Sequence, residues 1–93
     1  MVEKDIKLKI LELLQNNFLN RDLSSLQDDT LLGEEGLGID SLTFLKFLTE
    51  LEKDFGIRIE DDYWEYKHMN TLSKIVNYVH TRLKESQASW FTI

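Results

Sequence analysis

The sequence has no cysteine and no long apolar run, and each absence excludes a class of protein. Without cysteine, neither a disulfide nor a thiolate metal site can support the fold, and any thiol needed for function must come from outside the chain. No apolar stretch is long enough to cross a bilayer, and the N-terminus lacks the basic start and apolar core of a signal peptide. We therefore expect a cytoplasmic protein without a membrane partner.

Basic residues are scarce in the middle of the chain. The formal net charge is −6, and residues 28–40 contain five acidic residues and no basic one. Such a field repels phosphate backbones, so we expect no nucleic-acid partner, and it speeds encounters with basic protein surfaces. An acidic face that only keeps the protein soluble is an equally good interpretation.

Length and hydrophobic pattern predict one small helical domain. Ninety-three residues with 42% apolar content can bury roughly 60–70% of the surface that the unfolded chain exposes. Apolar residues recur at helical spacing over residues 3–18, 41–55 and about 71–85. Gly56 ends the second helix, and Asn70 or Thr71 caps the third. The predicted buried positions are Ile6, Ile10, Leu14 and Phe18; Phe44, Phe47, Leu48, Leu51 and Phe55; and Leu72, Ile75, Val76, Val79 and Leu83.

The remaining segments complete an all-α prediction. Residues 19–40 form a long connection whose five leucines should cover the open side of the bundle. Residues 57–59 look briefly strand-like, but no partner strand exists, and a short helix is expected near residues 61–67. The expected fold is a four-helix bundle of three long helices and one short one. Residues 1–85 form the domain and residues 86–93 a separable C-terminal tail.

The residues most suggestive of function are Asp40, Ser41 and Leu42, at the head of the second predicted helix. Ser41 follows a glycine-rich approach, with no histidine or lysine close by in sequence and no Gly-x-Ser-x-Gly elbow around it. It is therefore a poor candidate for a catalytic nucleophile and a good candidate for an attachment point. Either Ser41 or Asp40 could instead be the helix N-cap, and a capping Asp40 would leave Ser41 exposed.

The order of these features resembles the acyl carrier and peptidyl carrier protein family. Leu-Gly-Ile-Asp-Ser-Leu at residues 37–42 is similar to the attachment motif of the family, and residues 51–59 are similar to the Glu-rich, Phe-closed end of its second helix. The Thr-Leu pair at residues 71–72 is similar to the start of its last helix. The resemblance covers about residues 3–85 and extends to the order of the helices.

The resemblance implies a carrier that itself catalyses nothing. Ser41 would carry 4'-phosphopantetheine, donated by coenzyme A and linked to Oγ by a phosphodiester, and the terminal thiol would hold an acyl or aminoacyl group as a thioester. The implied partners are a phosphopantetheinyl transferase, adenylating, ligating or acyltransferring enzymes, and downstream biosynthetic enzymes. We expect the carrier itself to be a freestanding monomer.

A partner surface is expected around the attachment site. Leu42 resembles a hydrophobic contact of the family, and exposed aromatic residues commonly anchor interfaces. For Trp64, burial in the core is the favoured alternative. The predicted surface consists of Leu42, Lys46, Asp61, Tyr63 and Trp64, with residues 90–93 as a second candidate.

The outward face of the second helix bears on the pathway. Carriers of fatty acid synthesis usually place carboxylates there, whereas this sequence offers Thr43, Lys46, Thr49 and Lys53. We therefore favour specialised biosynthesis, such as that of nonribosomal peptides, polyketides or related antibiotics. A fatty acid synthesis carrier is the alternative, and an unmodified interaction module is the rival from another class. No metal is expected, because the two histidines are far apart in sequence and lack nearby cysteines.

Overall fold

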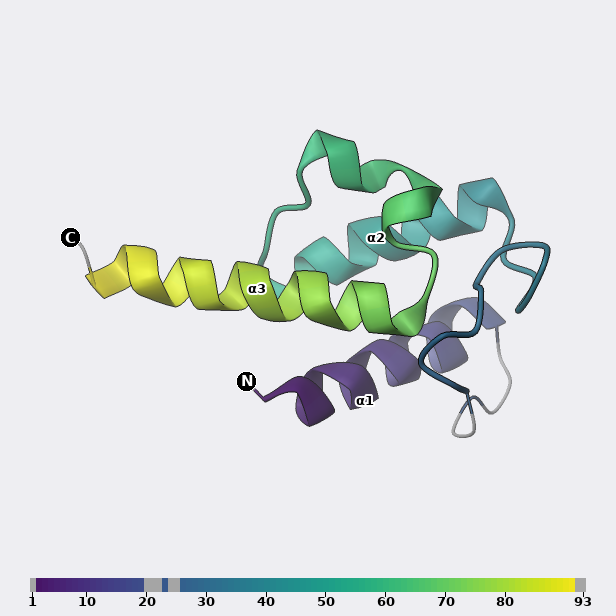
Figure 1. Cartoon of the computed structure of the whole chain (residues 1–93), viewed down its shortest axis with the longest axis horizontal. Helices are drawn as coiled ribbons and strands as arrows, with labels where there is room; N and C mark the ends of the chain where they lie inside the picture. Colours follow the sequence, from purple (N-terminus) through teal and green to yellow (C-terminus); the bar gives the residue numbers. More distant parts are fainter. Residues whose placement is uncertain (1, 20–22, 24–25, 92–93) are drawn as a thin grey trace.

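The computed structural model describes residues 2–19, 23 and 26–91, and the side chains of all of these except residues 17, 19 and 86–91. This part of the chain is helical, with three α-helices, α1 (Glu3–Leu13), α2 (Ser41–Phe55) and α3 (Leu72–Phe91). Figure 1 shows α1 packed beside α3, while the segment after α2 arches over to the start of α3. The all-α prediction is thus confirmed for the described residues.

The first predicted helix is present but changes type near its end. The α-helical part stops at Leu13, and a wider π-helix, η1 (Leu14–Leu19), continues one residue beyond the predicted end at residue 18. Asn16 and Asn17 favour the α-helix poorly, and the side-chain oxygen of Gln15 accepts a hydrogen bond from the backbone N–H of Leu23 at 2.9 Å. The π-helical turn therefore lies where the chain is tied to the following connection.

Helix α2 has the predicted bounds and the predicted buried face. Gly56 adopts the left-handed conformation, with φ 63°, and its backbone N–H bonds to the carbonyl of Glu52. This is the usual helix ending that glycine permits without strain. The five apolar residues predicted for the stripe are all buried: Phe44, Phe47, Leu48, Leu51 and Phe55.

The segment between α2 and α3 corrects one prediction. In place of a single short helix, the chain forms two 3-10 turns, η2 (Asp61–Trp64) and η3 (Tyr66–His68), separated by Glu65 in an extended conformation. The two aromatic side chains on either side of Glu65 are held by different partners. The Trp64 indole donates to the carbonyl of Ile59, whereas the Tyr66 hydroxyl reaches Gly33, so a continuous helix is not formed.

Helix α3 extends beyond its predicted end. Thr71 resolves the capping alternative, because its hydroxyl accepts from the backbone N–H of Lys74 at 3.2 Å. The helix then continues to Phe91 and not only to Glu85. Residues 86–88, Ser-Gln-Ala, contain no helix-stopping residue, so the sequence offers no reason to stop there. The domain boundary at residue 86 stays a prediction, and the side chains of residues 90–93 lie outside those described.

One apolar core joins the helices and the long connection. Leu23 and Leu32 are buried and Leu26 packs against the core, as expected for leucines that cover the bundle, but Leu31 is 38% exposed. Leu19 has no described side chain. Among the described residues, no polar or charged side chain is buried. The fully buried side chains are Phe47, Ile6, Ile10, Leu14, Leu32, Leu48, Leu51, Ile59, Met69, Leu72, Ile75 and Val79.

Candidate functional site

Ser41 is the first residue of α2 and its side chain is exposed. Asp40 is the N-cap, because its Oδ1 accepts a hydrogen bond from the backbone N–H of Thr43 at 2.7 Å. The capping function is therefore met without Ser41, whose hydroxyl makes no hydrogen bond to any other residue that the structure describes. Of the two alternatives left open by the sequence, the geometry selects a capping Asp40 and an exposed Ser41.

The charge of Asp40 is maintained by the same contact. The hydrogen bond from the Thr43 backbone, followed by that of its side chain, holds the pKa of the Asp40 carboxyl below its usual value, and Lys46 adds a small attraction. Asp40 is fully exposed, so little desolvation opposes this shift. The start of α2 thus presents a carboxylate beside a serine hydroxyl, over a helix end that is itself positively polarised.

A tight glycine loop leads to this helix start. The carbonyl of Gly33 accepts from the N–H groups of both Gly36 and Gly38, at 3.0 and 2.8 Å. Gly38 has a φ of 93°, a conformation that side chains rarely adopt, and the space around its Cα is open. A Cβ on Gly36 would overlap the carbonyl oxygen of Leu31. The loop therefore requires glycine at two positions for different reasons: conformation at 38 and close packing at 36.

An open groove of about 450 Å³ lies beside Ser41. Its lining combines apolar residues of α2 and the loop with two aromatic side chains from the segment between α2 and α3. Three carboxylates are among the lining residues, and no basic side chain is. The residues that line it are Gly33, Glu34, Glu35, Ile39, Asp40, Ser41, Phe44, Leu45, Trp64 and Tyr66.

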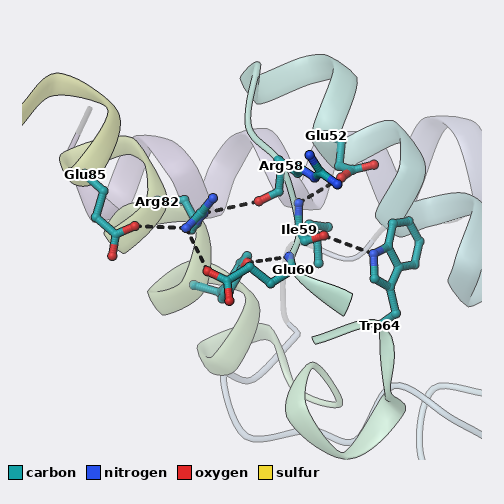
Figure 2. A network of polar contacts seen from close by, with 8 residues as sticks. Glu52, Arg58, Ile59, Glu60, Trp64, Arg82 and Glu85 are labelled. Carbon is teal, nitrogen blue, oxygen red and sulfur yellow. Dashed lines mark hydrogen bonds and ion pairs between the residues drawn. The ribbon is translucent and has the colours of Figure 1, made fainter. Parts of the chain in front are cut away.

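Trp64, which lines this groove, belongs to the polar network shown in Figure 2. Its indole Nε1 donates to the carbonyl of Ile59 at 3.1 Å, while the N–H of Ile59 donates to the Glu52 carboxylate at 2.8 Å. Arg82 of α3 binds the segment that follows α2, residues 57–60, through the carbonyl of Arg58 and the carboxylate of Glu60. Residues 57–60 are thus fixed between α2 and α3.

Tyr66 ends the segment 61–66 in which the sequence predicts part of the partner surface, but no pattern predicts its contact with the loop before Ser41. Its hydroxyl accepts a hydrogen bond from the backbone N–H of Gly33 at 2.7 Å and donates one to the carboxylate of Glu35. Burial and the Glu35 contact raise the pKa of Tyr66, so the phenol keeps its proton, and the same contact lowers the pKa of Glu35. These partners are more than thirty residues apart in sequence, and no local pattern connects them.

The residues of the predicted partner surface differ in exposure and in what they contact. Leu42, at 63% exposure, Lys46 and Asp61 are exposed. Trp64 lines the groove beside Ser41 but is partly buried against the core. Tyr63 instead packs against Tyr78, with the two rings tilted and their centroids 4.5 Å apart, and lines a separate hollow over α3.

Comparison with known proteins identifies the family. A family model described as "Phosphopantetheine attachment site" matches residues 8–79. The chain belongs to the phosphopantetheine-binding carrier family. It is 33% identical over 79 residues to an acyl carrier protein of Lactobacillus acidophilus, covering 85% of this chain and 94% of that protein. It is 27% identical over 75 residues to an acyl carrier protein of Rickettsia bellii strain RML369-C, covering 81% and 83% respectively.

The prosthetic group of this carrier family is 4'-phosphopantetheine, and the residues around Ser41 fit it. An exposed hydroxyl lies at a helix N-terminus, where backbone N–H groups favour a phosphate, and Gly38 leaves open space on the approach. Asp40 opposes part of that attraction by its charge. Members of the family are carriers and not catalysts.

Other ligand sites receive no support from the described residues. No group of three or more His, Cys, Asp or Glu side chains among them is placed to hold a metal ion. His80 pairs with Glu3 at 3.4 Å, and His68 packs on the ring of Tyr63. None of the described helices is both long enough and apolar enough to cross a bilayer.

Proposed function

We propose that the protein is a freestanding acyl or aminoacyl carrier whose 4'-phosphopantetheine arm is attached to the Oγ of Ser41. The supporting observation is an exposed serine at the first position of α2, inside the region matched by the family, with the capping role taken by Asp40. When bound, the arm supplies a thiol on which an acyl or aminoacyl group is carried as a thioester. The chain, which lacks cysteine, offers no competing thiol.

The attachment reaction assigns simple roles to the residues of this chain. The Oγ of Ser41 loses its proton to a base of the transferase and forms the new O–P bond, while the pyrophosphate of coenzyme A breaks and adenosine 3',5'-bisphosphate leaves. Backbone N–H groups at the start of α2 stabilise the added negative charge. Asp40 fixes the first turn of the helix through Thr43, and the exposed side chain of Leu42 gives a transferase an apolar contact beside the reacting hydroxyl.

The attachment site can be tested by intact-mass measurement. Wild-type protein is incubated with coenzyme A and a broad-specificity phosphopantetheinyl transferase, and we expect a mass gain of one phosphopantetheine. Ser41→Ala should abolish the gain. Ser73→Ala is the matched control, because Ser73 is also an exposed serine in the first turn of a helix, and it should be modified like wild type.

Two results would contradict the proposal. A mass gain that survives Ser41→Ala would place the arm elsewhere. No gain in folded wild type would favour the unmodified interaction module, a protein that uses the same fold only to bind a partner.

The nature of the cargo is a separate part of the proposal. On the outward face of α2, Lys46 and Thr49 are exposed, and Lys53 pairs with Glu50 at 3.5 Å, so the face lacks a row of free carboxylates. This supports dedicated partner enzymes of a specialised pathway, such as nonribosomal peptide or polyketide synthesis, acting in the cytoplasm. The relatives named acyl carrier protein keep fatty acid synthesis as the alternative.

The cargo is best identified on protein isolated from its native host. The intact mass gives the sum of arm and cargo, and mild thioester cleavage then separates the two. An aminoacyl or other specialised group supports the proposal. A series of saturated chains differing by two carbons would instead indicate fatty acid synthesis.

A further inference from the structure

Gly33 lies at the centre of the loop that precedes Ser41. Its carbonyl accepts two hydrogen bonds from within the loop, from the N–H groups of Gly36 and Gly38, and its own N–H donates to the hydroxyl of Tyr66. A Cβ at this position would come within 2.6 Å of the Tyr66 oxygen. The glycine and the tyrosine are therefore fitted closely to each other.

Tyr66 connects three separate parts of the chain. Its hydroxyl bonds Gly33 and Glu35 of the loop, and its ring packs edge-on against Phe44 of α2, with ring centroids 5.4 Å apart. Phe44 is buried and lies one turn after Ser41, on the inner face of the same helix. Tyr66 itself belongs to η3, so it holds the loop and the helix start against the segment that leads to α3.

The beginning of the loop is bound to the residues just before α3. The N–H of Leu32 donates to the carbonyl of Asn70 at 2.9 Å, and Leu31 forms an isolated antiparallel bridge with Thr71. These backbone contacts fix the beginning of the loop. The Tyr66 side chain holds the next part of the loop, because it bonds to Gly33 and Glu35. Both residues are closer to Ser41 in sequence than Leu31 and Leu32 are.

We propose that Tyr66 is a positioning residue for arm attachment, which holds the Gly33 peptide so that the loop and the start of α2 present Ser41 to the transferase in one arrangement. The inference rests on the proposed attachment at Ser41. Any enzyme that reaches the Oγ of Ser41 must contact the surface around it, and Gly33, Glu35 and Tyr66 line the groove beside that hydroxyl. The Tyr66 hydroxyl bonds to Gly33 and Glu35 and not to Ser41, so Tyr66 acts through the loop.

A positioning role predicts a specific kinetic effect. If the loop also samples other arrangements, the apparent affinity of the transferase falls in proportion to the binding-competent fraction, while the chemical step within the complex is unchanged. Loss of Tyr66 contacts should therefore raise KM for the carrier and leave kcat near the wild-type value.

The test is Tyr66→Phe, which keeps the ring on Phe44 and removes only the hydroxyl. We expect protection of the Gly33 amide against hydrogen exchange to fall roughly threefold to tenfold, the effect of one net hydrogen bond. KM for arm attachment should rise at least twofold, and its increase should not exceed the roughly tenfold upper limit expected for hydrogen exchange. The exchange measurement needs no transferase and no bound arm.

Tyr78→Phe is the matched control. The Tyr78 hydroxyl also accepts a backbone hydrogen bond, from the N–H of Glu60 at 2.9 Å, and burial also raises the pKa of this tyrosine. It lines the separate hollow over α3 and not the groove beside Ser41. Tyr78→Phe should leave KM and the exchange of Gly33 unchanged.

The outcomes separate this inference from the proposed function. A wild-type protein modified at Ser41, with Tyr66→Phe equal to wild type in KM and in Gly33 exchange, overturns the positioning role alone. A fall in kcat without a change in KM, or equal losses in Tyr66→Phe and Tyr78→Phe, also overturns it. No modification of wild type refutes the attachment proposal, and Gly33 exchange still tests the contact.

Glu35→Ala is the second variant, for use if Tyr66→Phe does not fold. It removes the acceptor of the phenol proton at a fully exposed position and should accelerate Gly33 exchange in the same direction, by a smaller factor. Unchanged exchange in this variant would then refute the proposal.

Discussion

The phase of α2 decides which of its residues can meet a partner, and Leu51→Ala tests it most directly. Leu51 lies at the centre of the buried stripe, and its side chain is 0% exposed. It belongs to the one cluster that joins all three helices and the long connection. No polar side chain is buried among the described residues, so the stability of this domain depends strongly on such apolar contacts.

The expected cost follows from this burial. Truncating a fully buried leucine to alanine removes its transfer free energy and leaves a partly collapsed cavity, which together amount to about 2–5 kcal/mol. Domains of this size are stable by about 5–15 kcal/mol, so the loss is a large part of the total. Leu42→Ala, on the same helix but 63% exposed, is the matched control and should change the free energy of unfolding by no more than about 0.5 kcal/mol.

Urea denaturation followed by far-ultraviolet circular dichroism measures both variants. The midpoint should shift for Leu51→Ala at an unchanged m-value, because the surface exposed on unfolding is nearly the same. The reasoning is refuted if the two variants have equal free energies of unfolding, or if Leu42→Ala is the less stable of the two. In either case, α2 would be rotated from its assigned phase, and Lys46 and Lys53 would not face outward.

Three further predictions concern the ends and the surface of α2. Gly56→Ala should destabilise the domain by about 1–2 kcal/mol, because alanine is strained at the left-handed φ of 63°; a denaturation midpoint equal to wild type would contradict this. Asp40 has a folded pKa below its usual 3.8, so its cap stabilises the fold above that pH and is lost as the pH falls through the lowered value. The stability advantage of wild type over Asp40→Asn should therefore shrink on acidification below about pH 4, and an advantage that grows would refute the assignment. Lys46→Glu should slow loading by the cognate enzyme and make the rate more dependent on salt, whereas an unchanged rate would move the docking surface elsewhere.

Much of the fold follows from local sequence patterns. The stripe from Phe44 to Phe55 and the stop at Gly56 are correct because an α-helix repeats every 3.6 residues and its signals lie within a few positions of each other. The motif around Ser41 is equally local, and together with the order of the helices it predicts the family. The capping alternative at residues 40–41 needed coordinates, since both residue types serve as N-caps.

One error occurs where a long-range contact enters a short segment. The sequence predicts a short helix near residues 61–67, but the chain forms two separate 3-10 turns. The Trp64 indole is bound locally, by the carbonyl of Ile59, whereas the Tyr66 hydroxyl is bound by Gly33, more than thirty residues away. The other error has a local cause. The predicted helix ends near Glu85 because the following residues lack an evident apolar stripe, but α3 continues to Phe91, since these residues include none that stops a helix.

The sequence by itself determined the three helices, the serine motif at the head of the second helix and the resemblance to the carrier family. The tertiary structure decided which residue caps α2, how the segment from Asp61 to His68 folds, and which side chain holds the loop before Ser41. Hydrophobic periodicity is carried by neighbouring residues and can be read along the chain. The bond from Gly33 to Tyr66 joins residues that become neighbours only when α2 and α3 pack around one core, so no local pattern could contain it.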